Sequence, residues 1–319
     1  MPSPPDRIPP IDQRSLPGKG GSVSAIALAI DPPAVAPPSA DARTVALLRR
    51  ARVHGVTTFD VADARHPERV ERLIAAAFPS DDPDLGVVVG RSVESLAREP
   101  ERSEGRAIED DLETAIGASI ARSAQRLSPA RIMIVEWEPS EGHETAPPIP
   151  ATSPSTDSEV RPPTLATRLS RVATALPRMS LAGSIVSDEL SLLDDHVISL
   201  MEATAEGLRP PLLARNPFAD GRLDGSRFEA TAVPAGPGEG PVDLRRLHAE
   251  FDPVLRLGFL TERRRRTLAQ AALQFVLAWP WVVSVVVPLP HPERFDEVLG
   301  FASATPFDTA ERRALGLMK

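Results

Sequence analysis

The apolar pattern is clearest at residues 267–299, where three segments with different periods follow one another. Leu268, Ala272 and Phe275 recur at helical spacing, the next segment VVSVVV is an almost unbroken run of β-branched residues, and Pro292 begins a second helical pattern. Because a strand that is apolar on both faces needs helices on both sides, this stretch predicts helix, buried parallel strand and helix. It therefore indicates an α/β protein.

The same alternation of periods recurs along the chain. Helical patterns cover 41–54, 67–78, 108–127, 164–176, 194–206, 244–257 and 309–317, and strand-like runs cover 24–30, 56–60, 85–89, 131–136, 181–187 and 211–215. Residues 14–28 place a Gly-rich turn beside an apolar alternation, which predicts a short hairpin. The most economical fold is a (β/α)8 TIM barrel, which takes about 250 residues and eight strands. Seven strands can be placed, so we expect one degenerate β/α unit between Glu136 and Leu181.

The chain divides into a short tail and one domain. Residues 1–13 are rich in proline, which predicts a disordered N-terminal tail, and 14–319 form the expected barrel. Residues 139–163 combine Pro, Ser, Thr and Glu without an apolar period. Such a composition buries too little apolar surface to offset the entropy lost on ordering. We therefore expect a flexible insertion at 139–163.

Charge and residue usage narrow the possible functions. Lys and Arg number 36 against 44 Asp and Glu, and a net charge of −8 disfavours nucleic acid or an anionic membrane surface as partner. The run RRRR at 263–266 is expected to be the solvated start of a helix. No apolar run reaches the roughly 18 residues of a membrane span, so we expect a cytoplasmic protein. The chain has no cysteine, and its six histidines lack metal-ligand spacing, so we expect no metal site.

Several motifs resemble the aldo-keto reductases. The segment RSLPGKGGSVSAIAL at 14–28 is similar to the family's opening, FDVADARH at 59–66 is similar to its FDTADvYG motif, and PERFDEVL at 292–299 is similar to its PER..EN motif. The resemblance covers 14–137 and 186–317, and it implies a TIM barrel that works as an NADP-dependent oxidoreductase of carbonyl compounds. In that family a tetrad of Asp, Tyr, Lys and His lies at the strand ends, with Tyr as proton donor to the carbonyl.

The resemblance implies catalytic positions at Asp60, Arg65, Arg91 and Glu136, and three of them depart from the family's tetrad. Asp60 matches, whereas Arg65 stands in place of Tyr, Arg91 in place of Lys and Glu136 in place of His. The chain contains no tyrosine at all. Because a guanidinium keeps its proton at neutral pH, Arg65 cannot act as the phenol does. A water molecule or Glu136 could replace the acid, although two nearby arginines would lower the pKa of that carboxyl.

The resemblance also implies positions for NADP, several of which have lost suitable groups. These positions are Ser187 at the carboxamide, Arg215 at the nicotinamide ring, Asn216 in the loop over the pyrophosphate, and Pro288, Leu289 and Arg294 at the adenosine phosphate. Leu289 is bulky, and prolines remove the backbone N–H donors that phosphate uses. Val298 stands where the family has an asparagine. We therefore expect binding of NADP to be weak or lost.

Three functional hypotheses remain open. The chain could be a reductase with unusual acid chemistry, a non-catalytic binding or regulatory pseudoenzyme, or a non-redox enzyme in which Arg65 and Arg91 clamp a carboxylate while Glu136 acts as base. A small carbonyl or carboxylate compound would be the ligand. Because strand ends converge in a barrel, the four charged residues could instead form only a structural ion-pair cluster at its mouth.

Overall fold

The computed structural model describes most of the sheet and the helices around it. The described residues are 9–16, 21–32, 37–62, 64–78, 85–92, 112–127, 131–138, 185–205, 209–228, 244–262, 266–289 and 292–318. The expected helix at 164–176 and the expected insertion at 139–163 lie outside these ranges. Within the expected N-terminal tail, Ile11 is buried, and its N–H donates to the carbonyl of His54 at 2.8 Å.

Within the described ranges, seven parallel strands form the central sheet. They are β3 (Ile26–Ala29), β4 (Thr58–Asp60), β5 (Gly86–Ser92), β6 (Arg131–Glu138), β7 (Val186–Glu189), β8 (Leu212–Arg215) and β9 (Val282–Pro288). Their order across the sheet is β6-β5-β4-β3-β9-β8-β7. The first of these strands in sequence, β3, therefore pairs in parallel with the last, β9, as the strand order of a barrel requires. The predicted α/β class is confirmed.

The described sheet is open, so the expected (β/α)8 barrel with one degenerate β/α unit is confirmed only as a curled parallel sheet with helices outside it, and not as a closed barrel. Within the described ranges, β6 and β7 are its two edges. These two strands are consecutive in the described chain, and most of the segment between them, 139–184, lies outside the described residues. The expected degenerate β/α unit belongs to this same interval. An eighth strand would have to lie between β6 and β7 because every other neighbouring pair is already hydrogen-bonded.

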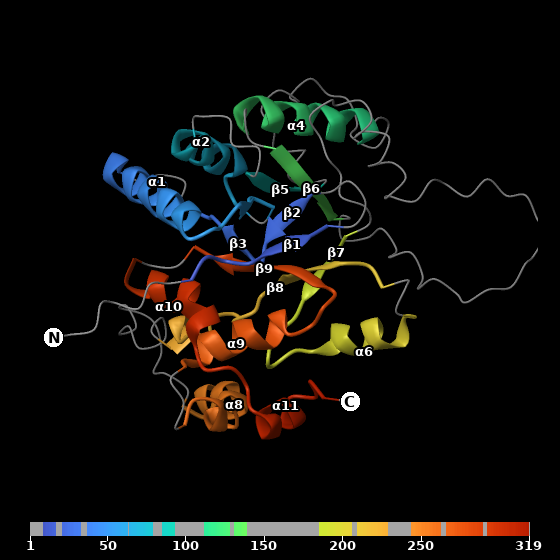
Figure 1. Cartoon of the computed structure of the whole chain (residues 1–319). Coiled ribbons are helices and arrows are strands. Elements are labelled where there is room, and N and C mark those ends of the chain that lie inside the picture. The colour runs from blue at the N-terminus through green and yellow to red at the C-terminus, as the bar shows by residue number, and fades with distance from the viewer. Residues whose placement is uncertain are drawn as a thin grey trace, which may run out of the picture.

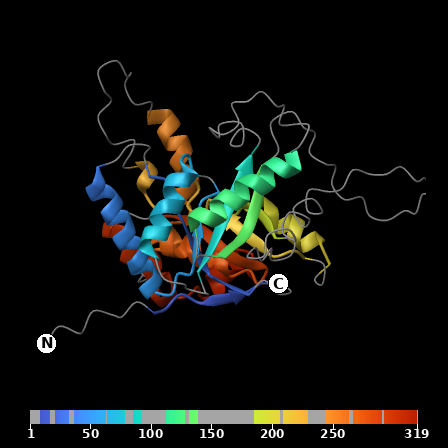
Figure 2. The same ribbon diagram turned by 90° about the horizontal axis from the view of Figure 1, so that it is seen from above.

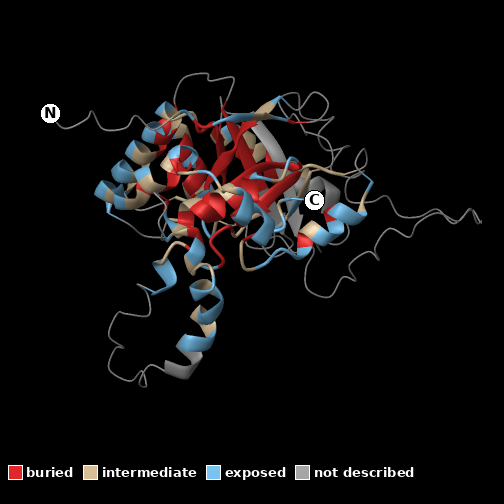
Figure 3. Ribbon diagram, turned by 60° about the horizontal axis from the view of Figure 1, so that its bottom comes forward, coloured by how far each residue is buried: buried red, intermediate tan, exposed pale blue. Residues whose placement is uncertain are grey.

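Helices lie outside the curled sheet. Figure 1 shows α1 (Pro38–Val53), α2 (Pro67–Ala77) and α4 (Leu112–Leu127) on one side, and α6 (His196–Ala203), α9 (Leu268–Leu277) and α10 (Phe295–Leu299) on the other. Neighbouring strand residues face opposite ways. Phe59 and Val87 join the apolar cluster under the helices, whereas Val88 and Leu213 join a second cluster inside the curl. Figure 3 shows this buried core in red, with α8 (Leu244–Leu255) standing out from the body.

The predicted hairpin covers the amino end of the sheet. It consists of β1 (Gln13–Ser15) and β2 (Ser22–Ser24), which pair antiparallel and lie across one end of the strands in Figure 2. The buried Ser24 hydroxyl accepts the backbone N–H groups of Thr57 and Thr58 at 3.0 and 3.1 Å. The Ser24 carbonyl accepts the hydroxyl of Ser284 at 2.8 Å. With this end covered, the carboxyl ends of the strands are left to carry the site.

A buried charge holds the C-terminal segment, although the sequence pattern predicted that this charge would be solvated. Arg266 belongs to the RRRR run that we expected to be solvated, yet it is 4% exposed. Its guanidinium pairs with Glu311, donates to the carbonyls of Leu260 and Thr305, and stacks on Phe307. Glu311 in turn belongs to α11 (Thr309–Ala314), and to a capping box at its start, as predicted. In the part of the chain that the structure describes, short 3-10 helices cover Gly258–Leu260, Pro292–Arg294 and Gly300–Ser303.

Candidate functional site

A buried ion pair lies at the carboxyl end of the sheet. Asp60 ends β4, and its side chain has no exposed surface. One carboxylate oxygen accepts from Arg215 Nη1 at 2.9 Å, and the other accepts the backbone N–H of Ala62 at 3.1 Å and lies 3.5 Å from Arg215 Nη2. Bidentate contacts of this kind fix the orientation of both groups. The carboxylate of Asp60 is therefore neutralised by a cation from β8.

Arg215 also reaches a third strand. Its Nε donates to the hydroxyl oxygen of Ser187 on β7 at 2.8 Å. In the sheet, β3 and β9 lie between β4 and β8. In a flat sheet these three strand spacings would amount to about 14 Å, more than an arginine side chain spans. The contact between Asp60 and Arg215 therefore depends on the curl of the sheet, which brings distant strand ends together.

In the described contacts, Arg65 does not interact with Asp60 or Arg215. Its Nε donates to Asp31 Oδ2 at 2.8 Å, and its backbone N–H donates to Asp31 Oδ1 at 3.1 Å. The Arg65 side chain is 71% exposed. An ion pair in so much solvent contributes at most about 1 kcal/mol to stability. The structure thus places the residue at the tyrosine position in a surface contact with the chain that follows β3.

Arg91 and Glu136 are placed by their backbone register alone. Asp60 pairs with Val88 of β5, and Glu136 of β6 pairs with Gly90, two residues further along β5. Arg91 pairs with Trp137. The side chains of Arg91 and Glu136 lie outside the described part, so their place in a charged cluster stays a prediction.

Sequence reasoning named Asp60, Ser187 and Arg215 but missed that they form one group. Asp60 was assigned to catalysis, and the other two were assigned to the cofactor. One signal was available, because a carboxylate at the end of a buried strand needs a cation nearby. Arg215 ends another strand of the same sheet. Choosing it over Arg65 required the curvature of the sheet.

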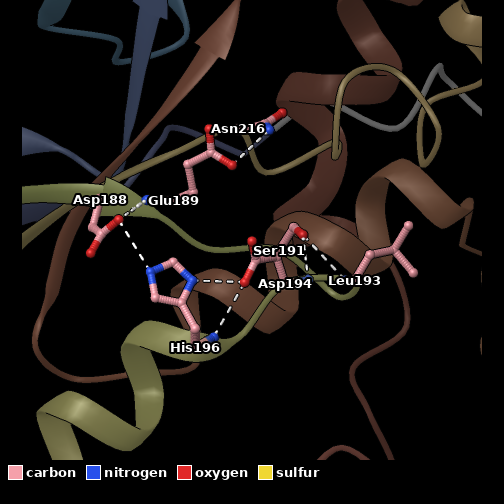
Figure 4. A network of polar contacts seen from close by, with 7 residues as sticks. All are labelled: Asp188, Glu189, Ser191, Leu193, Asp194, His196 and Asn216. Carbon is pink, nitrogen blue, oxygen red and sulfur yellow. Dashed lines mark hydrogen bonds and ion pairs between the residues drawn. The ribbon is translucent and has the colours of Figure 1, made fainter. Parts of the chain in front are cut away.

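The loop after β8 continues from Arg215 and carries an unusual backbone. Asn216, Ala219 and Asp220 all have positive φ, at 51°, 50° and 58°. The Asn216 side-chain oxygen accepts the backbone N–H of Asp220 at 2.8 Å. Its amide nitrogen donates at 3.1 Å to Asp220 and at 3.1 Å to Glu189 at the end of β7 (Figure 4). Asn216 therefore ties the loop to the neighbouring strand end.

A second polar network follows β7. His196 Nδ1 lies 2.7 Å from Asp194 Oδ1, and Nε2 lies 3.5 Å from Asp188 Oδ1 (Figure 4). The Ser191 hydroxyl accepts the backbone N–H groups of Leu193 and Asp194 at 3.2 and 3.0 Å. The hydrogen bond with Asp194 raises the pKa of His196, and the same bond lowers the pKa of Asp194. The turn between β7 and α6 is thus held partly by charge.

The positions expected to hold the adenosine phosphate are engaged within the protein. Pro288 ends β9 and pairs with Ala29 of β3. Leu289 packs against the core, and its N–H donates to the Ala29 carbonyl at 2.8 Å. Arg294 donates to the main-chain carbonyl of Asp224. Pro288 has no N–H, and the N–H of Leu289 is already used, so these two residues present no backbone donor to a phosphate.

The described residues include neither a cluster of metal ligands nor a helix that could span a membrane. In these ranges no group of three or more His, Cys, Asp and Glu side chains could hold a metal ion. No helix in the same ranges is long and apolar enough to cross a membrane.

Solved structures of aldo-keto reductases share this fold. An aldo-keto reductase from Bacillus halodurans, 15% identical, gives a TM-score of 0.60 in its apo form over 96% of this chain and 95% of that one, and 0.57 in its holo form over 96% of each. A glycerol dehydrogenase from Gluconobacter oxydans, also 15% identical, gives 0.59 over 96% and 94%. An aldo/keto reductase from Klebsiella pneumoniae in complex with NADP and acetate, 14% identical, gives 0.52 over 93% and 92%.

The likeness to these proteins concerns the fold. A scan against family models found no match, and a search of curated proteins by sequence found none either. The solved structures nevertheless match this chain over nearly its whole length. The resemblance to aldo-keto reductases that the motifs suggested is therefore confirmed at the level of the fold.

Proposed function

We propose that this chain is an aldo-keto reductase-like barrel with one degenerate β/α unit, descended from NAD(P)H-dependent oxidoreductases of carbonyl compounds, in which the family's carbonyl reduction is impaired or lost. The observation that carries the proposal is the pair of Asp60 with Arg215. The fold supplies the family's scaffold, whereas the charged group at its strand ends is rebuilt around a guanidinium.

The described group supports loss of reduction because the arginine in it is no suitable acid. Hydride transfer to a carbonyl leaves an alkoxide that must take up a proton. Arg215 carries a guanidinium that stays protonated at neutral pH, so it can donate a hydrogen bond but not a proton. Arg65 has the same limitation and lies in a surface ion pair with Asp31. The chain has no tyrosine, so the family's proton donor itself is absent.

The surroundings of β9 support weak or lost binding of NADP. The N–H of Leu289 is bonded to Ala29, and Arg294 donates to the carbonyl of Asp224. A dinucleotide would have to break or bypass such contacts, so part of its binding energy would be lost. A small carbonyl or carboxylate compound remains the proposed ligand, rather than nucleic acid or a membrane surface, and the cytoplasm remains the proposed location.

Of the alternatives, a non-catalytic binding protein fits these contacts better than a carboxylate clamp built from Arg65 and Arg91. A clamp would require Arg65 to break its ion pair with Asp31. We therefore propose that the protein binds a ligand with little or no turnover.

The test combines a binding assay with a turnover assay. NADPH is titrated into the full-length protein while its fluorescence is followed, and oxidation of NADPH is then measured with a panel of aldehydes and ketones. We expect no saturable binding in the micromolar range and no turnover above the rate without protein. A micromolar or tighter dissociation constant together with carbonyl-dependent oxidation would refute the proposal.

A further inference from the structure

Helix α8 is supported by little of the protein's own core. It stands out from the body in Figure 3, and none of its side chains from His248 to Leu255 is buried. Val254 packs against the main core cluster but stays partly exposed. Pro253 lies inside the helix and removes one of its backbone hydrogen bonds. A helix of this length is marginal in water unless an apolar face is covered, so α8 would gain from a partner on its outer side.

The outer side of α8 carries an exposed apolar patch. Leu255 is 71% exposed, and Phe228 is 56% exposed. The ring of Phe251 meets that of Phe228 edge to face, with 6.1 Å between the centroids. Residues four apart on a helix share a face, so Leu255 lies beside Phe251. Phe228, Phe251 and Leu255 thus form one patch, called the α8 patch below, and exposed apolar patches with a polar rim mark protein contacts.

One ion pair borders the α8 patch. Asp252 and Arg256 pair with each other while their side chains stay 56% and 77% exposed. The N–H of Arg256 donates to the carbonyl of Asp252 at 3.3 Å, so the helical turn continues to Arg256. Leu255 therefore shares its face with a carboxylate and a guanidinium that follow one another along the helix. Because so exposed a pair contributes little to stability, both groups can change partner at small cost.

We propose that the α8 patch docks a second copy of this chain, with the two α8 helices packed antiparallel about a two-fold axis beside Leu255. A two-fold axis places the same surface on both subunits, so the surface must complement itself. Here the apolar side chains meet at the centre, and Asp252 of each copy faces Arg256 of the partner subunit. A partner of uniform charge would match only one of these two groups, so the charges favour a second copy.

The contact is small, so the dimer is weak. Stable interfaces bury about 1,200–2,000 Å² in total, and a patch on one short helix falls at the low end of the scale or below it. We expect a dissociation constant of about 10–100 μM. Sedimentation velocity of the full-length protein, from about 5 to about 500 μM, spans that range on both sides. A protein that stays monomeric throughout overturns the proposal.

Charge reversal tests the pairing across the axis. Asp252→Lys and Arg256→Glu each bring like charges together, so each should weaken dimerisation at least about tenfold. In an equimolar mixture of these two variants, every contact across the axis again joins opposite charges, so mixed dimers should form as readily as dimers of the unmodified protein. The double variant, with both changes in one chain, should dimerise by itself for the same reason. Failure of both restorations overturns the antiparallel arrangement.

The matched control reverses a similar charge elsewhere. Arg72 and Glu68 form an exposed pair of the same spacing on α2, so Arg72→Glu should leave dimerisation unchanged. Circular dichroism checks that each variant is folded. Should a single reversal fail to fold, Leu255→Ser takes its place and should also weaken dimerisation at least about tenfold. A dimer that survives this change lies on another surface and overturns the proposal. These measurements use neither NADPH nor a carbonyl compound, so their outcome is independent of the proposed function.

Discussion

The two ends of the sheet are built from different kinds of contact. At the amino end, buried hydroxyl groups satisfy backbone groups, as Ser24 does for Thr57 and Thr58, and the hairpin closes over them. At the carboxyl end, a charged pair spans the curl and continues into a strained loop. Arg14 adds a charged group at the amino end, but its guanidinium donates to the backbone carbonyls of Leu277 and Val282. Charged groups and left-handed backbone cost stability, and they are typical of regions kept for binding or chemistry.

The largest effect is expected where a buried charge loses its partner. Arg215→Leu removes the cation that the described contacts place against the buried carboxylate of Asp60, which should lower the free energy of unfolding by about 3–5 kcal/mol. Arg65→Leu is the matched control, because its exposed pair with Asp31 should contribute less than about 1 kcal/mol. Urea unfolding followed by tryptophan fluorescence measures both. Equal losses in the two variants would mean that the carboxyl end is not organised around Asp60.

A smaller loss is expected at the amino end. Ser24→Ala removes the acceptor for two buried N–H groups, which should cost about 2–3 kcal/mol in the same unfolding measurement. Because the contact is neutral, the loss should be nearly independent of salt, whereas the effect of an exposed charged pair falls as salt screens it. A strong salt dependence for Ser24→Ala would remove the contrast between the two ends.

The left-handed backbone of the loop after β8 predicts that stability depends on the shape of the side chain at position 219. Ala219→Val puts a β-branched residue into the left-handed region and should cost about 1–2 kcal/mol. Ala219→Gly should come within about 0.5 kcal/mol of the unmodified protein, because relief of strain offsets the greater freedom of the unfolded chain. Thermal unfolding of the pair measures the difference. Were glycine the more damaging substitution, the left-handed backbone would not be a source of strain here.

The smallest effect concerns pH at the turn after β7. The pKa of His196 is raised by its hydrogen bond with Asp194, so its contribution to stability is full below the unfolded pKa of 6.5 and is lost as pH rises through the folded pKa. His196 is exposed, so solvent screening limits the contribution to about 0.5 kcal/mol. The free energy of unfolding at pH 5.5 and at pH 8.5 is measured for the unmodified protein and for Asp194→Asn. The variant should lose this pH dependence, and an unchanged profile would contradict the assignment.

Local sequence patterns predicted much of the fold. The apolar run of β9, the helix before it and the hairpin near the N-terminus were predicted from period and turn residues, and the structure has them. The capping box of Asp308 and Glu311 was also predicted, because its two side chains bond backbone groups three residues away. Such features depend on sterics and burial over a few residues, which the sequence expresses directly.

The partners of the charged residues were decided by the tertiary structure alone. Asp60 and Arg215 are 155 positions apart and meet only because the sheet curls, while Arg266 is buried against Glu311 although its RRRR run suggested a solvated helix start. An arginine side chain is long and can pair with any carboxylate that the fold brings within reach. The sequence therefore determined which segments are helix and strand and placed Asp60 at a strand end. Which cation neutralises Asp60 was settled by the curvature of the sheet, because curvature decides which strand ends converge.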